Sequence, residues 1–358
     1  MHDFQGLVEP ANTRHTVHDQ QAGLASGQNL QRRRFLRASL GIALLAGTGT
    51  LSGCSIHPEP GLRIATNPWI GYELLYLSRD LAESEADDAY RVRLVELLSN
   101  SDSLQALAAG TVDGAGLTLD EAIAARAAGL DLKIVLVFDF SAGADVLLAR
   151  PGIEALGMLK GKRIGVEQTG VGALMLDAAL KQAGLAARDI EVVSLTVDQH
   201  LAAFGSGKVD ALVTFEPIAG QVVAAGGRRL FDSRAIPGAI VDVLAISSSA
   251  LMASPRTTRT LLARYFKAQT YLREHPRDAH RRMAPRLGLT PEAMQAGYQG
   301  LVLPDLAENR RLLGGAPSPL QVGAAKLATL MLEKKLLARP IEVSDFIVDT
   351  CLPEAWAA

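Results

Sequence analysis

The residues of this sequence with the clearest capacity for chemistry are five carboxylates in or beside short loops that follow apolar runs. They are Glu73, Asp120, Asp145, Glu216 and Asp242. Carboxylates bind cations and accept hydrogen bonds, and no comparable set of Arg or Lys side chains occupies the same loops. The pattern therefore favours a site for a neutral or cationic small molecule, such as a heterocycle. It does not exclude an anion, because backbone amides alone can hold one.

Aromatic and small polar side chains accompany these carboxylates. Trp69 and Tyr72 follow the first expected strand, beside Asn67, and predict stacking on a ligand, with packing onto the following helix as the alternative. Ser101 and Asp102 are candidates for polar contacts, and helix capping is their alternative role. The remaining candidates are one hydroxyl and two aromatic residues that would form apolar walls or core: Thr118, Phe140 and Phe215.

The turn Thr169-Gly170-Val171-Gly172 opens directly into an expected helix. Glycine permits close backbone approach, and the first amides of a helix can hold an anionic or polar group. The turn is therefore a candidate for backbone contact with a ligand, and an ordinary strand-to-helix turn is the alternative.

Composition and motifs exclude several function classes. The 36 basic and 38 acidic side chains nearly balance, which indicates no nucleic-acid partner. Seven His are scattered and the only Cys are Cys54 and Cys351, so no metal-ligand spacing occurs. Neither a Ser-His-Asp order, a Gly-x-Ser-x-Gly elbow nor His-Glu-x-x-His is present. His200 could act as a base, with capping as the alternative. We expect no metal, no cofactor and no enzyme activity.

Alternating strands and helices must position these residues. Strands are expected at 62–65, 91–97, 114–117 and 133–137, with helices at 72–81, 103–109 and 121–128. A second series after Pro151 has strands at 161–166, 190–195, 211–214 and 240–246, and helices at 172–183, 201–205 and 218–225. From Pro255 the pattern is helical, at 256–274, 291–299 and 319–337. This order predicts an α/β protein with doubly wound, mostly parallel sheets in two lobes.

The lobes are expected at 60–148, 149–240 and 241–350, so that the chain crosses twice between them, near 148–151 and 241–244. Ligands of open α/β sheets bind at the carboxyl ends of strands, so the site should lie between loops of both lobes. Asp145 and Asp242 would then either fix a hinge or face the cleft. Glu216 precedes Pro217 in a strand-to-helix turn, so it predicts a ligand contact or a charge favoured by the helix dipole.

Two stretches share one layout of helix, glycine, aspartate and small-residue strand: ALAAGTVDGAGLTLDEA and AFGSGKVDALVTFEP. With TNPWIGYELLYL and LKGKRIGVEQTGVGALMLDAALKQAGL, they make residues 62–247 similar to the periplasmic solute-binding proteins of ABC importers. The similarity is to the branch of nitrate, sulfonate, taurine and thiamine-pyrimidine-precursor binders. It implies the two-lobed type II periplasmic binding protein fold, with a helical C-terminal tail packed on the first lobe.

The resemblance also implies a function and partners. A monomer would capture a small organic molecule between its lobes and deliver it to an ABC permease and ATPase. The carboxylates favour a ligand other than sulfonate or nitrate. One alternative is a co-receptor for a membrane sensor. Another is an enzyme on the same fold, but the precursor-synthesis enzymes depend on a Cys-rich motif that this sequence lacks.

Residues 31–54 resemble a lipoprotein export signal. The stretch QRRRFLR precedes an apolar run that ends in Leu51-Ser52-Gly53-Cys54, which is similar to a bacterial lipobox. The resemblance implies a leader over 1–53 and an acylated Cys54 that holds the protein to the lipid membrane on the periplasmic side. The Arg run also resembles a twin-arginine motif, with general secretion as the alternative route.

Overall fold

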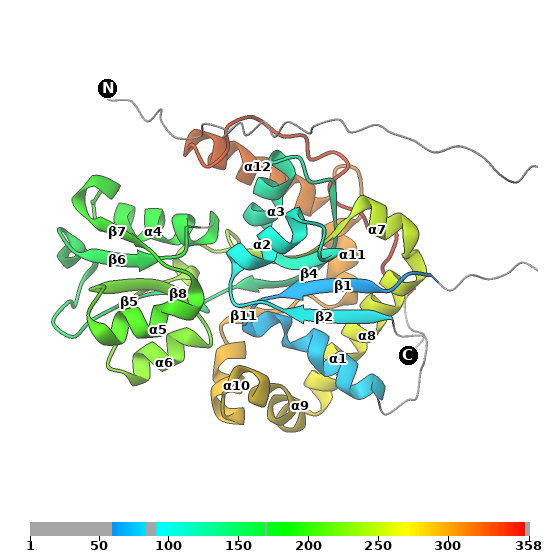
Figure 1. The fold of residues 1–358 in the computed structure, drawn as a ribbon, viewed down its shortest axis with the longest axis horizontal. Coiled ribbons are helices and arrows are strands. Elements are labelled where there is room, and N and C mark those ends of the chain that lie inside the picture. The colour runs from blue at the N-terminus through cyan, green and yellow to red at the C-terminus, as the bar shows by residue number, and fades with distance from the viewer. Residues whose placement is uncertain (1–58, 84–90, 169, 355–358) are drawn as a thin grey trace, which may run out of the picture. The chain divides into compact units, whose positions relative to one another are not determined.

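The computed structural model describes residues 59–83, 91–168 and 170–354. The leader 1–53, Cys54 and Thr169 lie outside the described residues, so the predictions made for them remain predictions. Residues His57–Ala358 form one compact unit. Its described part contains two mixed sheets, each flanked by helices (Figure 1). We call the larger sheet with its helices the first lobe, and the smaller sheet with its helices the second lobe.

The first lobe is built on six strands. They are β1 (Leu62–Thr66), β2 (Val92–Glu96), β3 (Gly114–Thr118), β4 (Leu132–Ser141), β10 (Val241–Ser247) and β11 (Leu301–Val302). Their order is β11-β4-β10-β3-β1-β2. β1 pairs in parallel with β2 and β3, and β10 lies antiparallel between β3 and β4. Every residue of β3 is buried, as expected for a strand covered by helices on both faces.

The second lobe is built on five strands. They are β5 (Asp145–Ala149), β6 (Arg163–Val166), β7 (Glu191–Ser194), β8 (Ala211–Phe215) and β9 (Arg228–Asp232). Their order is β7-β6-β8-β5-β9, with β6 parallel to β7 and β8, and β5 antiparallel to β8 and β9. In both lobes most strands run in one direction. The predicted fold class, two α/β lobes with mostly parallel sheets, is confirmed.

The chain crosses between the lobes earlier than the sequence pattern predicts. β5 pairs with β8 and β9 of the second lobe, so the first crossing lies between Ser141 and Asp145, not at 148–151. The second lies between Asp232 and Val241. The two crossings are joined, because the Ser233 hydroxyl contacts Ser141 Oγ at 2.8 Å and accepts the Gly143 N–H at 2.7 Å. The first-lobe boundary predicted at 148 therefore shifts toward the N-terminus.

Helices cover both sheets. Those of the second lobe are α4 (Gly170–Gln182), α5 (Val197–Ser206) and α6 (Ile218–Ala224). Those of the first lobe before its second crossing are α1 (Glu73–Glu83), α2 (Asn100–Ala108) and α3 (Leu119–Ala127). The rest are α7 (Ser248–Ala253), α8 (Pro255–Glu274), α9 (Pro276–Met283), α10 (Pro291–Tyr298), α11 (Leu306–Leu313) and α12 (Pro319–Glu333).

The C-terminal helices pack on the first lobe, as predicted. α8 contacts α1, α11 contacts β4 and α12 contacts α3 (Figure 1). Several begin with proline directly after a capping residue, as at Ser318 and Pro319, which suits the first turn of a helix because its amides lack partners within the helix. None of the helices in the described ranges is long and apolar enough to cross a membrane.

Each lobe contains the same bidentate ion pair between an Arg and an Asp, which we call the Arg–Asp fork. Arg63 on β1 donates from its backbone N–H and its guanidinium to Asp113, at 2.8 to 3.0 Å. Arg163 on β6 does the same to Asp210, at 2.8 to 3.1 Å. In both lobes the guanidinium also reaches the carbonyl of a glycine after the preceding helix. The repeated helix-glycine-aspartate layout therefore closes the amino ends of the strands.

Candidate functional site

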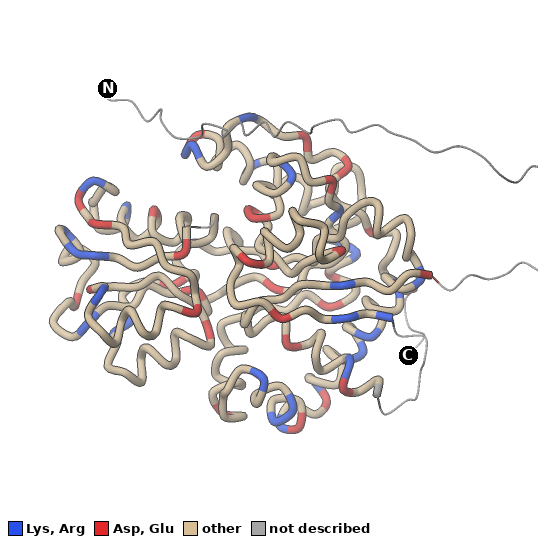
Figure 2. The backbone as a smooth tube through the Cα atoms, in the orientation of Figure 1, with Lys and Arg blue, Asp and Glu red and all other residues tan. Residues whose placement is uncertain are grey.

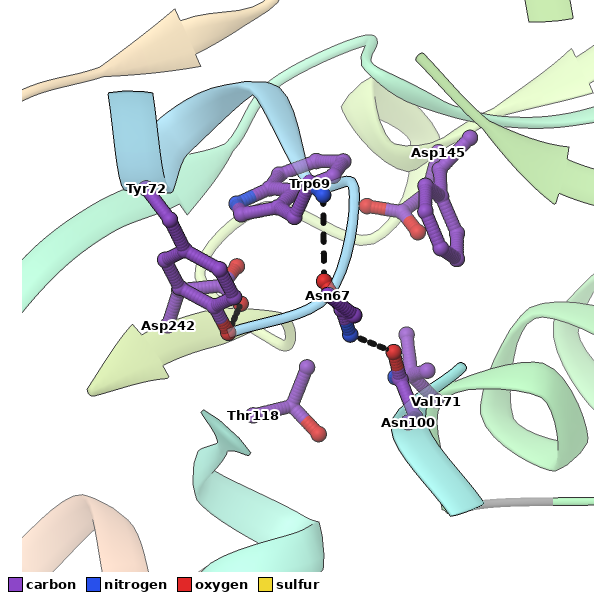
Figure 3. Close-up of a pocket in the computed structure, with 9 residues that line it drawn as sticks. Asn67, Trp69, Tyr72, Asn100, Thr118, Asp145, Val171 and Asp242 are labelled. Carbon is purple, nitrogen blue, oxygen red and sulfur yellow. Dashed lines mark hydrogen bonds between the residues drawn. The ribbon is translucent and has the colours of Figure 1, made fainter. Parts of the chain in front are cut away.

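Two small chambers lie between the lobes, at the carboxyl ends of the strands, and Figure 3 shows the first of them. The first chamber takes Asn67, Trp69, Tyr72, Asn100, Thr118 and Asp242 from the first lobe and Asp145, Val171 and Phe215 from the second. The second chamber shares Asn100, Asp145, Val171 and Phe215, and adds Glu167, Gly172, His200, Val213 and Thr214. The space that a water-sized molecule can occupy in them is about 10 and 20 Å³. Residues from both lobes therefore enclose one composite site.

A chain of amide and carboxylate hydrogen bonds holds the first-lobe wall. Asn67 follows β1, its side-chain oxygen accepts the Trp69 N–H at 3.0 Å, and its amide donates to Asn100 (Figure 3). The Asn100 amide donates to Glu121 Oε1 at 2.7 Å, and Glu121 Oε2 accepts the Thr118 N–H at 3.0 Å. Because each polar group constrains the next, this wall is preorganised.

Aromatic rings form the apolar side of the first chamber. Trp69 lies edge-on to Phe215 of the second lobe, with ring centroids 5.4 Å apart. Its indole N–H donates to Asp139 at 3.2 Å. The Tyr72 hydroxyl donates to Asp242 at 2.9 Å (Figure 3). The Tyr72 ring lies over Gly116, where an added Cβ would be 2.7 Å from the ring. Only glycine leaves room for the ring at that position.

Several carboxylates of the site keep an oxygen without a hydrogen-bond partner among the described residues. They include Asp145 Oδ2, Asp242 Oδ2 and Glu167 Oε2. Asp145 is 5% exposed and Asp242 is 3% exposed. A buried carboxylate oxygen without a donor is costly, so these atoms favour a bound proton or a ligand that donates hydrogen bonds or carries positive charge.

Burial and mutual repulsion raise the pKa of this group of acids. Burial, with a contribution from the charge of Glu121, raises the pKa of Asp145 to about 7. Burial raises the pKa of Asp139 to about 7, and burial with repulsion from Asp139 and Asp145 raises that of Asp242 well above its usual range. Asp139 and Asp242 stand opposite each other on paired strands. Figure 2 shows acidic segments where the two sheets face each other.

The predicted glycine turn faces a carboxylate of the protein itself. A Cβ at Gly170 would lie 1.7 Å from Asp120 Oδ2, so the first residue of α4 packs directly on Asp120 of the first lobe. Burial raises the pKa of Asp120 to about 6. The start of α4, where an anionic ligand would be favoured by the helix dipole, is therefore occupied by an internal carboxyl group.

Among the described residues that line the two chambers there is neither Lys nor Arg. Arg286 and Arg229 both bind other groups of the protein. Arg286 donates to the fully buried Glu73 at 2.7 Å, and burial still raises the pKa of Glu73 to about 7. Arg229 lies 3.8 Å from Glu216 and donates to the Gly143 carbonyl at 3.0 Å.

The structure brings together most of the residues that the sequence singled out. Those at the chambers are Asn67, Trp69, Tyr72, Thr118, Asp145, Val171, Gly172, Phe215 and Asp242. Ser101 and Gly170 line a wider groove outside the chambers. Thr169 is not among the described residues.

Apart from Asp120, which packs on Gly170 as described above, four further candidates stand outside the chamber linings. Glu73 is paired with Arg286, and Phe140 lines a separate hollow near Gly238. Glu216 accepts the Gly220 N–H at 3.0 Å and so caps its own helix. Asp102 lies in the first turn of α2, and the N-cap is Ser99, not Ser101 or Asp102. For Glu216 and Asp102, a role at a helix start explains the observed contacts.

Sequence reasoning missed four chamber residues: Asn100, Glu167, Val213 and Thr214. Glu167 follows β6 directly, two positions before the turn at 169–172 that the sequence singled out. His200, considered only as a possible base, is buried on α5 and its Nδ1 lies 3.0 Å from the Thr214 hydroxyl. Burial lowers the pKa of His200 to about 4, so the ring is neutral at physiological pH. The sequence around His200 gave no signal of that buried environment.

The arrangement can bind by hydrogen bonds, charge and ring contacts. Among the residues that line the chambers in the described chain, neither Ser nor Cys offers a nucleophile. No group of three or more His, Cys, Asp or Glu within the described ranges has a geometry that could hold a metal ion.

Comparison with known proteins identifies the family of this chain. Residues 56–288 match the model of the NMT1-like family. A protein of Escherichia coli (strain K12) named as an aliphatic sulfonates-binding protein is 30% identical over 194 residues. That match covers 53% of this chain and 60% of the relative, so the chain spans less than two thirds of the relative's length.

Two solved structures show the same fold. The ligand-binding component of an ABC-type import system from Staphylococcus aureus, with zinc bound, has a TM-score of 0.70 at 17% identity. The alignment covers 82% of this chain and 98% of that one. The desulfurization enzyme DSZB has a TM-score of 0.58 at 20% identity, over 82% of this chain and 97% of that one. The fold therefore carries both binding proteins and an enzyme.

Proposed function

Because the chain belongs to the NMT1-like family, we propose that it is an extracytoplasmic solute-binding protein that delivers a small organic molecule to an ABC permease and its ATPase. The observation that carries this proposal is the pair of chambers enclosed by residues from both lobes, with Trp69 and Phe215 meeting across them at 5.4 Å. A site of that kind is completed only when the lobes close. Closure can therefore report the loaded state to a permease.

The ligand of this protein is a molecule other than an aliphatic sulfonate. A sulfonate would place a permanent negative charge beside Asp145 and Asp242, which lack any Lys or Arg neighbour in the chamber linings. It would also compete with Asp120 for the start of α4. Like charges in one buried site repel strongly. A cation, or a ligand with several hydrogen-bond donors, would instead satisfy the free carboxylate oxygens.

We infer further that the mature protein is a monomer tethered to the membrane through acylated Cys54. The basis is the Leu51-Ser52-Gly53-Cys54 sequence after a run of Arg. Cys54→Ala should move the protein from the membrane fraction of cells to the soluble fraction. Unchanged fractionation would contradict the tether and leave the binding function intact.

The fold of a desulfurization enzyme does not favour catalysis here. The chamber linings offer no Ser or Cys nucleophile, and His200 is buried and neutral. Binding of a solute without turnover is the function we propose.

Calorimetric titration of the purified full-length protein against a panel of amines, amidines, sulfonates and neutral heterocycles tests this function. We expect a member of the amine, amidine or heterocycle sets to bind, and small-angle scattering to show a smaller radius of gyration once it is bound. If only sulfonates bind, the proposed ligand class is wrong. If a saturating ligand leaves the radius unchanged, the closure mechanism is wrong.

A further inference from the structure

A large groove lies directly outside the two chambers, between the same two lobes. The space that a water-sized molecule can occupy is about 810 Å³ in the groove, compared with about 10 and 20 Å³ in the two chambers. Sites for drug-sized ligands usually occupy several hundred Å³, so each chamber has room for one small charged or polar group and little more. The rest of a larger ligand would have to lie in the groove.

The groove is mostly apolar and both lobes contribute to it. α2 and α3 supply Leu104 and Ala124 from the first lobe, and Met331 of α12 lies on the same side. Ala173 and Leu176 of α4 form the opposite wall. No Lys or Arg is among its described lining residues, so nothing in it would neutralise an anion. Such a surface suits a hydrocarbon or ring system.

Glu167 joins the groove to the second chamber, because it lines both. Its Oε1 accepts the N–H of Ser101 at 3.0 Å and the Ser101 hydroxyl at 2.7 Å, which links the second lobe to the first. Its Oε2 has no partner among the described residues. The boundary between chamber and groove is therefore a carboxylate with one free oxygen.

The polarity of the site thus changes along one direction. At the inner end, Asp145 and Asp242 are almost fully buried and each keeps an oxygen without a donor. At the outer end lie Leu104, Ala173 and Met331. Glu167 lies at the boundary between the two ends, because it lines both the second chamber and the groove. A ligand complementary to both must carry donors or positive charge at one end and apolar surface at the other.

Resting on the solute-binding function proposed above, we infer that the ligand is an amphiphilic organic cation. Its protonated amine or amidine head lies among the carboxylates of the chambers, and its apolar tail lies in the groove between α2, α3 and α4. Specificity is then divided, because the chambers select the charge of the head while the groove selects the length of the tail.

The test is a titration of the full-length protein with n-alkylamines from butyl to decyl, beside n-alkanesulfonates of the same lengths. Amine affinity should rise about three- to fourfold per methylene until the groove is filled. Sulfonates should not bind at any length. Amines that bind with equal affinity at every length would overturn the tail site while leaving solute capture in place. Sulfonates with a length dependence, or amines that fail to bind at all, would overturn the cationic head.

Substitutions assign the two parts of the ligand to the two parts of the site. Ala173→Gln and Ala124→Gln, on opposite walls, should each flatten the length dependence while leaving butylamine affinity unchanged. Asp145→Asn should lower affinity for all amines at least tenfold without changing the slope. Gln182→Ala on the exposed face of α4 is the matched control and should alter neither. A slope that survives both groove substitutions would place the tail elsewhere and overturn the inference.

Discussion

The two lobes share the Arg–Asp fork at the amino ends of their strands and differ in the side chains at the carboxyl ends. At the amino ends of the strands, Arg63 holds Asp113 in the first lobe as Arg163 holds Asp210 in the second, with nearly equal distances. At the carboxyl ends the first lobe presents a network of amides, tyrosine and aspartates. The second presents Glu167, a neutral His200 and Phe215. The repeated part is scaffold, and recognition resides in the part that differs.

The comparison explains why a sequence motif can identify a fold without identifying a ligand. The phrases with a helix, a glycine and an aspartate recur because each lobe needs the Arg–Asp fork to close its strands. The forks lie at the amino ends of the strands, whereas the chambers lie at the carboxyl ends. A substitution at the fork should therefore alter stability, while one at the chambers should alter affinity.

The largest expected effect comes from Gly170→Ala at the contact between lobes. The new Cβ would meet Asp120 Oδ2 at 1.7 Å, and Asp120 is fully buried, so the lobes must separate to relieve the clash. We expect ligand affinity to fall at least tenfold, about 1.4 kcal/mol, while the melting temperature of the ligand-free protein changes little. Calorimetry, unliganded melts and small-angle scattering measure these three quantities.

Gly205→Ala is the control for that experiment. Gly205 lies in α5 and an added Cβ would meet nothing within 4 Å, so affinity and radius of gyration should stay at their wild-type values. If Gly170→Ala binds as tightly as the control, the start of α4 is not part of the closed interface.

A smaller effect is expected from pH on the melting temperature of the ligand-free protein. It tests the burial of the acidic groups at the chambers. The pKa values of Asp139, Asp145 and Glu121 are raised to about 7, so the folded state binds more protons than the unfolded state between pH 4 and 7. Their contribution to stability is present at low pH and is lost as the pH rises through about 7. His200, with its pKa lowered to about 4, acts in the opposite direction between pH 6.5 and 4.

The pKa values of Glu73, Asp120 and Asp242 are raised as well, so the carboxyls with raised pKa outnumber His200 and His280, whose pKa values burial lowers. The ligand-free protein should therefore melt several degrees higher at pH 5.5 than at pH 8. Asp145→Asn removes one of these carboxyls and should reduce the difference. Thermal melts across this range provide the measurement, and a melting temperature that rises steadily from pH 5.5 to pH 8 would show that the chamber acids are not buried as described.

The smallest effects are expected at the two forks, and they should be alike. Asp113→Ala and Asp210→Ala each remove a partly exposed bidentate pair, so each should lower the melting temperature by a few degrees. Binding should stay within about twofold of wild type because the forks are distant from the chambers. If either substitution lowers the free energy of binding by more than it lowers the free energy of unfolding, the division between scaffold and binding site is wrong.

Sequence patterns predicted well those strands and site residues that depend only on neighbouring positions in the chain. Alternating apolar runs located β1, β3 and β8, and the rule that ligands meet the carboxyl ends of strands located Asn67, Thr118 and Phe215. The run Val146-Leu147-Leu148-Ala149 is also apolar, but an apolar run does not show which sheet it joins. The crossing at Ser141 to Asp145 therefore could not be read from the sequence.

Side-chain direction was the other unpredictable quantity. Glu167 and Glu216 both follow strands of the second lobe, yet Glu167 turns toward Ser101 and the second chamber while Glu216 turns back onto Gly220. Their neighbours in sequence do not distinguish them. Asn100 could be expected to lie near a helix start, but its role depends on Asn67 and Glu121, which are 33 and 21 positions away.

The position of β10 also sets the order in which this protein can be assembled. β3 and β4 are joined only through β10, and the whole second lobe comes between β4 and β10 in the chain. As the chain is synthesised, the second lobe is complete and can collapse on local contacts while the first sheet is still in two pieces. Synthesis must pass Ser247 before those open strand edges are sealed, so a chaperone that shields β-edges would act on the first lobe late in synthesis.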